Sequence, residues 1–181
     1  RKYTGMILEN DGIRLRAVEP EDLELLYRWE NDESNWKLSN TLVPYSRYIL
    51  KKYIAGSGKS IYETGQMRLM IDIVPDERTV GTIDLYDFDH YHNRAGVGIL
   101  IADPSDRKKG YASAALSCLI NYAFDTIGLH QLWCTIQSTN PERMHLFTNH
   151  GFILCATRKE WIRTEEAYET EHTLQLINTK K

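Results

Sequence analysis

Hydrophobic and polar residues alternate in some segments and recur at helical spacing in others, which predicts a chain of both strands and helices. Alternation over 13–18 predicts a first strand. Pro20 and the two carboxylates after it mark a helix running to about Asp32, because proline suits the first turn and acidic side chains favour its positive end. A second helix is expected after Ser46, ending near the glycines at 56–58.

Strand signals dominate the middle of the chain, and strands alternate with helices after it. The expected elements are, in order, strands over 68–74, 80–89 and 95–102, a helix over 111–126, a strand over 131–136, a helix over 141–149 and a hairpin of 152–162 with 168–177. A strand–helix–strand order implies at least one parallel pair, so the predicted fold class is a mixed α/β (α+β) sheet flanked by helices. No repeat or linker interrupts the pattern, which predicts a single domain over residues 1–181.

Composition narrows the function classes. The chain is 42% hydrophobic and 26% charged with a net charge of −3, which argues against a broad nucleic-acid surface. No apolar run approaches the roughly 20 residues that cross a bilayer, so no membrane partner is expected. Residues 1–5 show no feature of a signal peptide. The isolated cysteines predict reduced thiols and a cytoplasmic protein; they are Cys118, Cys134 and Cys155.

The segment from Ile99 to Ala112 is the most informative for function. A buried strand passes through a basic turn directly into a helix. The first amides of a helix lack internal acceptors and carry partial positive charge, and Gly110 lets a ligand approach the backbone closely. This arrangement predicts a phosphate site, and a pyrophosphate would span it better than a single phosphate.

The chain resembles the GNAT superfamily of acetyl-CoA-dependent N-acetyltransferases over about 13–177. The family signature Arg/Gln-x-x-Gly-x-Gly/Ala falls on Arg107, Gly110 and Ala112, and the later signature falls on Asn140, Phe147, Gly151 and Phe152. Within the superfamily, the motifs Leu15-Arg16-Ala17, Trp29-Glu30-Asn31-Asp32 and His90-x-His92-x-Arg94-Ala95 are similar to a branch that holds ribosomal-protein N-terminal acetyltransferases and spermidine acetyltransferases.

The resemblance implies a strongly curved mixed sheet whose two central parallel strands, 95–102 and 131–136, splay apart to hold acetyl-CoA. It implies that backbone groups of Leu100, Ile101 and Ala102 meet the pantetheine arm and that Asn140 contacts it from the other strand. The residues it places at the pyrophosphate are Arg107, Lys108, Lys109, Gly110, Tyr111, Ala112 and Ser113.

Direct attack of an amine on the thioester requires removal of a proton, positioning and stabilisation of the oxyanion. Two positions depart from the resemblance: Phe147 stands where many relatives have a tyrosine acid, and Gly96 where the branch often has glutamate. Cys134 is expected to be a packed core thiol rather than a nucleophile. The catalytic residues stay open, with four candidates: Asp84, Asp87, His92 and Ser138.

These features predict an acetyltransferase that acts on a primary amine, either a protein N-terminus or a small cationic molecule such as a polyamine. The alternative is a catalytically silent module that binds coenzyme A, which the changes at Phe147 and Gly96 motivate. His90 and His92 lack a third ligand at suitable spacing, so no metal site is expected. The terminal hairpin could pair across a homodimer.

Overall fold

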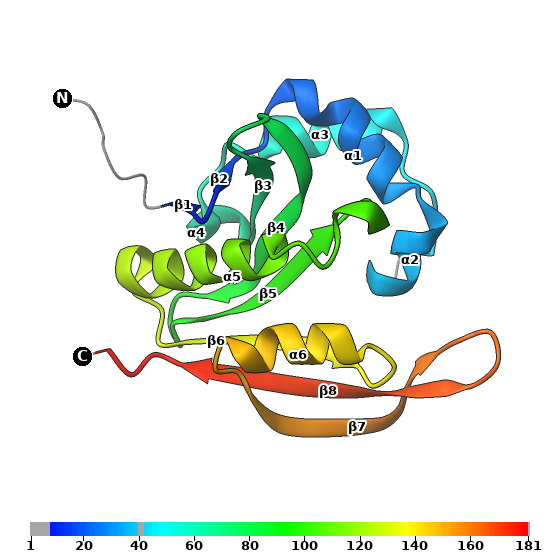
Figure 1. The fold of residues 1–181 in the computed structure, drawn as a ribbon, viewed down its shortest axis with the longest axis vertical. Helices are drawn as coiled ribbons and strands as arrows, with labels where there is room; N and C mark the ends of the chain where they lie inside the picture. The colour runs from blue at the N-terminus through cyan, green and yellow to red at the C-terminus, as the bar shows by residue number, and fades with distance from the viewer. Residues whose placement is uncertain (1–7, 40–41, 181) are drawn as a thin grey trace.

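The computed structural model describes residues 8–39 and 42–180, so the predicted features of residues 1–5 lie outside it. An eight-stranded mixed sheet forms its centre, with strand order β1-β2-β3-β4-β5-β6-β8-β7 (Figure 1). The strands are β1 (Glu9–Asn10), β2 (Ile13–Ala17), β3 (Met67–Ile73), β4 (Arg78–Asp89), β5 (Arg94–Ile101), β6 (Gln131–Gln137), β7 (Ile153–Arg163) and β8 (Tyr168–Ile177). All are antiparallel to their neighbours except β5 and β6, which form the predicted parallel pair.

Helices connect these strands largely where the periodicity predicts them. They are α1 (Leu23–Glu30), α2 (Glu33–Ser39), α3 (Arg47–Gly56), α4 (Ile61–Thr64), α5 (Tyr111–Asn121) and α6 (Pro141–Asn149), with short 3₁₀ turns η1 (Pro20–Asp22) and η2 (Pro104–Asp106). The predicted helix over 111–126 continues past α5 as a π-helical segment, η3 (Tyr122–Ile127). It ends at Gly128 as expected, where a φ of 80° suits glycine. The sequence analysis did not predict β1, α2 or α4.

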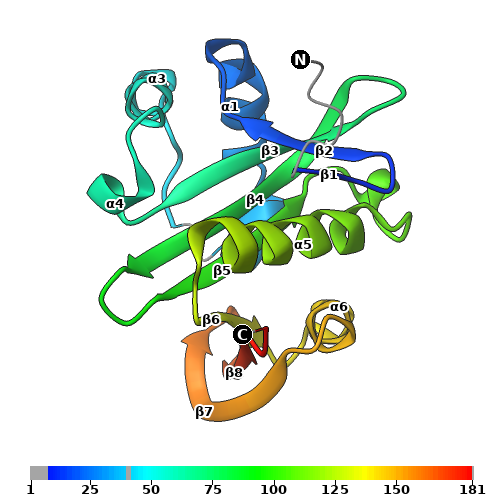
Figure 2. The same cartoon turned by 90° about the vertical axis from the view of Figure 1, so that its left-hand side faces the viewer.

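The two faces of the sheet carry different helices (Figure 2). The buried side of α5, with Leu116 and Leu119 fully covered, packs in the main core with Ile71 and Ile83 of the sheet. Alternation along β3 sends Met70 to the opposite face, where it forms a second cluster that includes Leu26 of α1 and Leu50 and Ile54 of α3. The mixed sheet flanked by helices therefore confirms the predicted fold class. None of the described helices is long and apolar enough to span a membrane.

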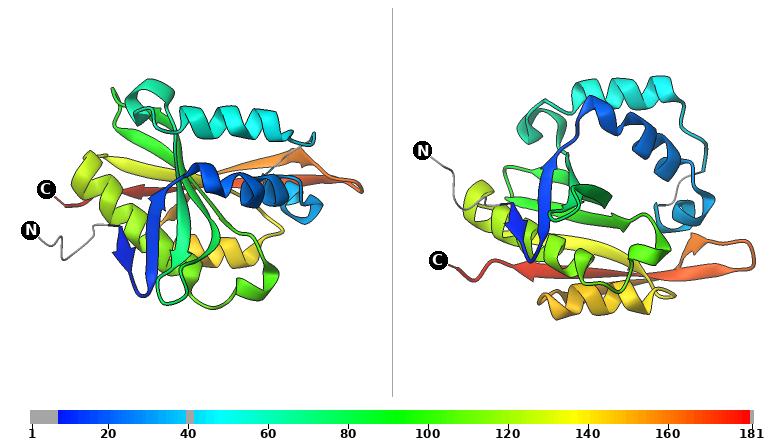
Figure 3. Two further views of the ribbon diagram at one scale, coloured as in Figure 1. Left: turned by 90° about the horizontal axis from the view of Figure 1, so that it is seen from above. Right: turned by 45° about the horizontal axis from the view of Figure 1, so that its top comes forward.

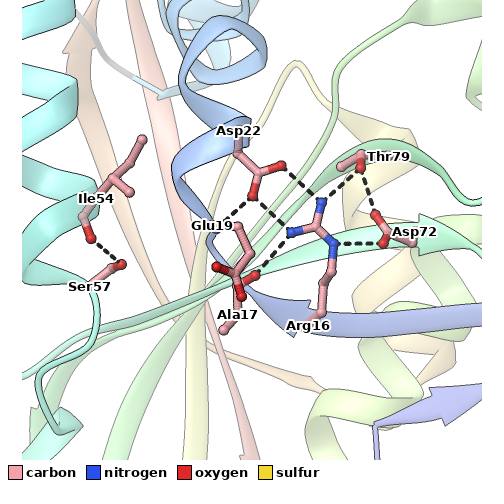
Figure 4. Close-up of polar contacts among 8 residues, drawn as sticks. All are labelled: Arg16, Ala17, Glu19, Asp22, Ile54, Ser57, Asp72 and Thr79. Carbon is pink, nitrogen blue, oxygen red and sulfur yellow. Dashed lines mark hydrogen bonds and ion pairs between the residues drawn. The ribbon is translucent and has the colours of Figure 1, made fainter.

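A buried charged cluster fastens the first strand to the start of α1 (Figure 4). The guanidinium of Arg16 binds both carboxylate oxygens of Asp22 at 2.8 and 2.9 Å. Its Nε donates to Asp72 of β3 at 2.7 Å, and a further N–H donates to Thr79 at 3.1 Å. Such planar, two-pronged pairing fixes direction as well as distance, so β2, β3 and η1 are held in one arrangement.

The β7–β8 hairpin extends beyond the rest of the sheet, and its tip lies at the same end of the molecule as α2 (Figures 1 and 3). β8 pairs with β6 along the whole of Gln131–Gln137, while β7 forms the outer edge. Nearly every residue of β7 is exposed. The hairpin thereby reaches past the ends of β5 and β6, where it borders the candidate site.

Candidate active site

The site begins where the two parallel strands separate. β5 and β6 pair only through Arg94–Gln131, Ala95–Leu132 and Gly96–Trp133, and no pairing continues beyond them. Ala102 donates its N–H to Val80 of the neighbouring β4 at 3.0 Å. Because backbone groups alternate in direction along a strand, Leu100 also faces β4, whereas Ile99 and Ile101 turn their N–H and C=O groups toward the gap.

Two arginines meet the carbonyls that β5 exposes in this gap. Arg143 of α6 donates from Nη2 to the Ile99 carbonyl, and Arg107 donates from Nε to the Ile101 carbonyl at 3.1 Å. Arg107 also reaches Asn35 of α2 at 3.5 Å. The unpaired edge of β5 is thus a row of peptide groups beside two positive charges. Of the three residues predicted to meet the pantetheine arm, Ile101 alone turns its peptide groups into the gap; Leu100 and Ala102 use theirs in the sheet.

The basic turn leads from β5 into the start of α5. Lys108 and Gly110 adopt left-handed backbone conformations, with φ of 60° and 84°. The first amide of the helix that binds a preceding carbonyl is that of Ala114, which donates to Gly110 at 3.0 Å. The amides of 111–113 have no acceptor within the described part of the chain, as expected for a first helical turn.

A buried carboxylate holds this turn in place. Asp106 of η2 is 4% exposed, and both of its oxygens accept from Arg78 of β4, at 2.7 and 2.8 Å. The hydrogen bonds from Arg78 keep the pKa of Asp106 below its ordinary value, although burial opposes this. The carboxylate therefore stays charged, and the turn that follows it is anchored to the sheet.

A cleft of about 1640 Å³ runs from this turn along the gap to the β7–β8 hairpin. One end, which we call the phosphate end because the sequence predicts a phosphate site there, is walled by the basic turn, the start of α5 and the start of α6. Nine of the predicted cofactor residues line it: Leu100, Ile101, Arg107, Lys108, Gly110, Tyr111, Ala112, Ser113 and Asn140. Ala102 and Lys109 are outside the lining.

Polar contacts join the basic turn and the first turn of α5 to α6 across the phosphate end. Lys108 pairs with Glu142 of α6 at 3.2 Å, and Ser113 shares a 2.9 Å hydrogen bond with the ring of His150. Asn140 begins α6 as its cap, with its side-chain oxygen accepting from the Arg143 amide at 3.0 Å. Both helix starts therefore open into the same cleft, which suits a ligand carrying negative charge.

The other end of the cleft is rich in carboxylates. It is lined by residues of α2, by Leu42 and by the hairpin. The described residues are Glu33, Trp36, Leu42, Ile162, Arg163, Thr164, Glu165, Glu166 and Glu169. Trp36 is fixed by a 2.6 Å hydrogen bond from its ring N–H to the Glu30 carbonyl. Glu169 accepts from Thr139 at 2.8 Å. A cationic group would meet charge and an aromatic face here.

The four catalytic candidates lie outside the lining of this cleft. Asp84 accepts from Nε and Nη2 of Arg68, both at 2.9 Å, and Nη1 of Arg68 donates to Glu30 at 2.8 Å. Asp87 and His92 are exposed near the β4–β5 hairpin, at the opposite end of β5 from the basic turn. Ser138 is exposed and donates its amide to Thr170 at 2.9 Å. Their catalytic roles stay predictions.

Phe147 and Gly96, the two positions that depart from the family pattern, both lie against aromatic side chains. Phe147 is 1% exposed and packs edge-on against Phe152, with ring centroids 5.0 Å apart. Above Gly96 lies the ring of Tyr86, which also contacts Trp133 edge-on with ring centroids 5.2 Å apart. Burial raises the pKa of Tyr86 to about 12, so its phenol stays protonated. The ring fills the space that a larger side chain at 96 would need.

Sequence reasoning missed Tyr86 and Arg143 as residues of this region. A signal existed for Arg143, because it stands three residues after Asn140 and four before Phe147, which places all three on one helical face. The expectation for Cys134 is confirmed: the side chain is 1% exposed, and burial raises the pKa of its thiol to about 12. Such a thiol is a packing group rather than a nucleophile.

Comparison with known proteins identifies a family whose sequence pattern this chain shares. The sequence profile of the acetyltransferase (GNAT) domain matches residues 13–153. A curated relative, spermidine N(1)-acetyltransferase of Vibrio cholerae, is 24% identical over 147 residues, which cover 80% of each chain.

Solved structures share the fold. The crystal structure of the Vibrio cholerae spermidine N-acetyltransferase in complex with CoA and spermine matches with a TM-score of 0.84 at 20% identity, covering 93% of this chain and 96% of that one. A dodecameric structure of the Vibrio cholerae enzyme in an intermediate state matches with a TM-score of 0.74 at 21% identity, covering 93% and 95%.

Proposed function

The chain belongs to the GNAT acetyltransferase family and transfers an acetyl group from acetyl-CoA to an amine, and we propose that this amine is carried by a polyamine. The observation behind the acceptor is the carboxylate-rich end of the cleft. Glu33, Glu165 and Glu166 line it without an ion pair to any cation of the described residues. Unpaired carboxylates attract a chain of several ammonium groups more strongly than a single charge.

We also propose which part of acetyl-CoA each group of cleft residues binds. The amides of 111–113, with Arg107 and Lys108, hold the pyrophosphate of acetyl-CoA at the phosphate end. The N–H groups of Ile99 and Ile101, whose carbonyls accept from Arg143 and Arg107, offer strand-like hydrogen bonds to the pantetheine arm. This assignment puts the thioester near the base of the gap, between the phosphate end and the carboxylates.

The acceptor is bound by attraction to the glutamates and by contact with the aromatic ring of Trp36. Trp36 lines this end of the cleft and is held by its hydrogen bond to Glu30, so an ammonium group that contacts its ring meets a side chain that is already ordered. The amine that attacks must be neutral, while the other ammonium groups of the same molecule can stay charged against the glutamates. A peptide α-amine has no such second charge, which is why the cleft favours a polyamine.

The test compares acceptors directly. Purified protein is incubated with acetyl-CoA and spermidine, spermine, free amino acids or short peptides, and the release of free CoA thiol is followed. We expect kcat/KM for the polyamines to exceed that for the peptides by more than about tenfold, the effect of at least one extra ~1.4 kcal/mol contact. Equal or greater release with a peptide would reassign the acceptor to a protein N-terminus.

Two finer expectations accompany this function. We infer a homodimer formed through the hairpin, supported by the exposed apolar residues along β7 and β8, Ile153, Leu154, Trp161 and Tyr168, which are 50–72% exposed. Light scattering on the purified protein tests it, and a monomer at all concentrations would contradict it. The cytoplasm is the compartment we propose, because the three cysteines are free thiols.

A further inference from the structure

The side chain of Arg143 extends from α6 into the gap between β5 and β6. Its guanidinium donates to the carbonyl of Ile99, on the β5 edge that the splay leaves unpaired. Arg143 lines the main cleft and also a small polar pocket beside β6, together with Thr135 and Glu171. The cation therefore stands between the phosphate end of the cleft and its carboxylate end.

This positive charge has no carboxylate bound to it within the described residues. The charged or titratable groups that face it come from four neighbouring elements. They are Tyr86 of β4, Arg107 of the turn after β5, Cys134 of β6 and, across the small pocket, Glu171 of β8. Burial lowers the pKa of the Arg143 guanidinium, because desolvation is not compensated by a counter-charge. Such a site favours the arrival or formation of an anion.

The helix places Arg143 on the same face as Phe147 and one turn closer to the start of α6. The ring of Phe147 is buried against Phe152 and offers no proton donor. Arg143 has five N–H donors in a planar fork, of which one meets Ile99, so the others can bind a second partner.

Acetyl transfer creates an anion in this gap. The amine nitrogen attacks the thioester carbon and forms the C–N bond, the C–S bond breaks, and its electron pair passes to sulfur. The proton that the amine loses goes to solvent. A thiol has a pKa of about 8.5, so sulfur can leave as the thiolate without being protonated first, provided that its charge is stabilised.

We propose that Arg143 stabilises the negative charge that develops on the sulfur of coenzyme A, so that this chain needs no acid at position 147. The proposal rests on acetyl transfer and is independent of which amine accepts the acetyl group. A guanidinium stays protonated at all ordinary pH values, so it acts by charge and hydrogen bonding alone. The residue would contact the reacting atom, which makes it a catalytic residue.

The direct test is a titration of CoA bound to the protein, without any acceptor. The ultraviolet absorbance of the thiolate is followed against pH for wild type, Arg143→Met and Arg143→Lys, with Arg28→Met as the control. Arg28 is an exposed arginine of α1 outside the cleft lining. We expect the pKa of the bound thiol to lie below that of free CoA by about 1 or more in wild type and in the control. In Arg143→Met it returns to the free value, and in Arg143→Lys part of the lowering remains.

Turnover gives the second readout, measured with whichever amine wild type accepts best, so a failure of the polyamine assignment leaves this test intact. We expect kcat of Arg143→Met to fall by about 10²- to 10³-fold, the usual loss on removing a group that stabilises transition-state charge. The proposal is overturned if the thiol bound to wild type titrates like free CoA. It is equally overturned if Arg143→Met binds CoA but keeps either the lowered pKa or the wild-type kcat.

Discussion

The ring of Tyr86 lies directly over Gly96, so close that a Cβ built on the glycine would come within 2.6 Å of the ring carbon Cζ. The same Cβ would lie 3.0 Å from the ring of Trp133. The Tyr86 ring can therefore pack in this position only because residue 96 has no side chain. The missing glutamate at 96 follows from the space that Tyr86 takes.

This contact predicts the effect of adding one methyl group. Gly96→Ala should lower the free energy of unfolding by about 1–3 kcal/mol, because overpacking forces the ring aside. Gly98→Ala is the matched control on the same strand, since its Cβ would meet Tyr86 only at 3.8 Å. Urea denaturation measures both. Equal stability of the two variants would show that Tyr86 does not confine position 96.

The charge at the phosphate end predicts how cofactor binding responds to Arg107. Arg107→Glu should weaken CoA binding by more than about tenfold, because it places a carboxylate beside the phosphates and removes a cation. Isothermal titration calorimetry measures the dissociation constant, with Arg28→Glu as a control of equal charge change at an exposed position of α1. An unchanged constant for Arg107→Glu would contradict the placement of the pyrophosphate.

The carboxylates of the hairpin predict that their removal weakens the binding of the acceptor and leaves the binding of acetyl-CoA unchanged. Glu165→Gln with Glu166→Gln should raise KM for spermine roughly fivefold or more, since each exposed pairing contributes up to ~1 kcal/mol. KM for acetyl-CoA should stay unchanged. Glu63→Gln, in exposed α4, is the control. A parallel rise in both KM values, or none for spermine, would argue against the acceptor site.

Acid stability should depend on the Arg16 cluster. Burial raises the pKa of Asp22, but hydrogen bonds from Arg16 and from the Glu19 amide outweigh it and hold the pKa below its usual 3.8. A carboxyl whose folded pKa is lowered adds stability above its unfolded pKa and loses it as pH falls through the folded value. Wild type should therefore lose stability progressively below about pH 4 to 5.

Arg16→Met tests the same cluster at neutral pH. It should lower the free energy of unfolding at pH 7 by about 3–5 kcal/mol, because it leaves two mostly buried carboxylates without their cation. In that variant the further loss between pH 5 and pH 3 should shrink (both limits approximate), since Asp22 is no longer held charged. An undiminished acid loss in Arg16→Met would point to other carboxylates.

Local signals made most of the fold predictable. Periodicity located the long strands and α3, α5 and α6, because each buries a regular face. Three short elements were not predicted because they carry little periodic pattern. They are β1, α2 and α4, which are only 2, 7 and 4 residues long. The basic turn was recognisable for the same reason as the long elements: Arg107 to Gly110 and the helix after it are contiguous in sequence.

The chemistry at the base of the gap was less predictable, because it depends on contacts between distant segments. From the sequence alone, Asp84 is a plausible general base. In the structure it forms an ion pair with Arg68 of the neighbouring strand, which also pairs with Glu30 of α1. Tyr86 matters only through Gly96, and Arg143 only because β5 and β6 separate below it. No single segment contains these relationships.

The central claim is that coenzyme A binds in the gap between β5 and β6, with its pyrophosphate at the start of α5. A crystal structure of the protein with CoA tests it most directly. We predict pyrophosphate oxygens within hydrogen-bonding distance of the amides of Tyr111, Ala112 and Ser113, and the sulfur beside Arg143. CoA bound elsewhere, or bound here with those amides turned away from its phosphates, would contradict the account.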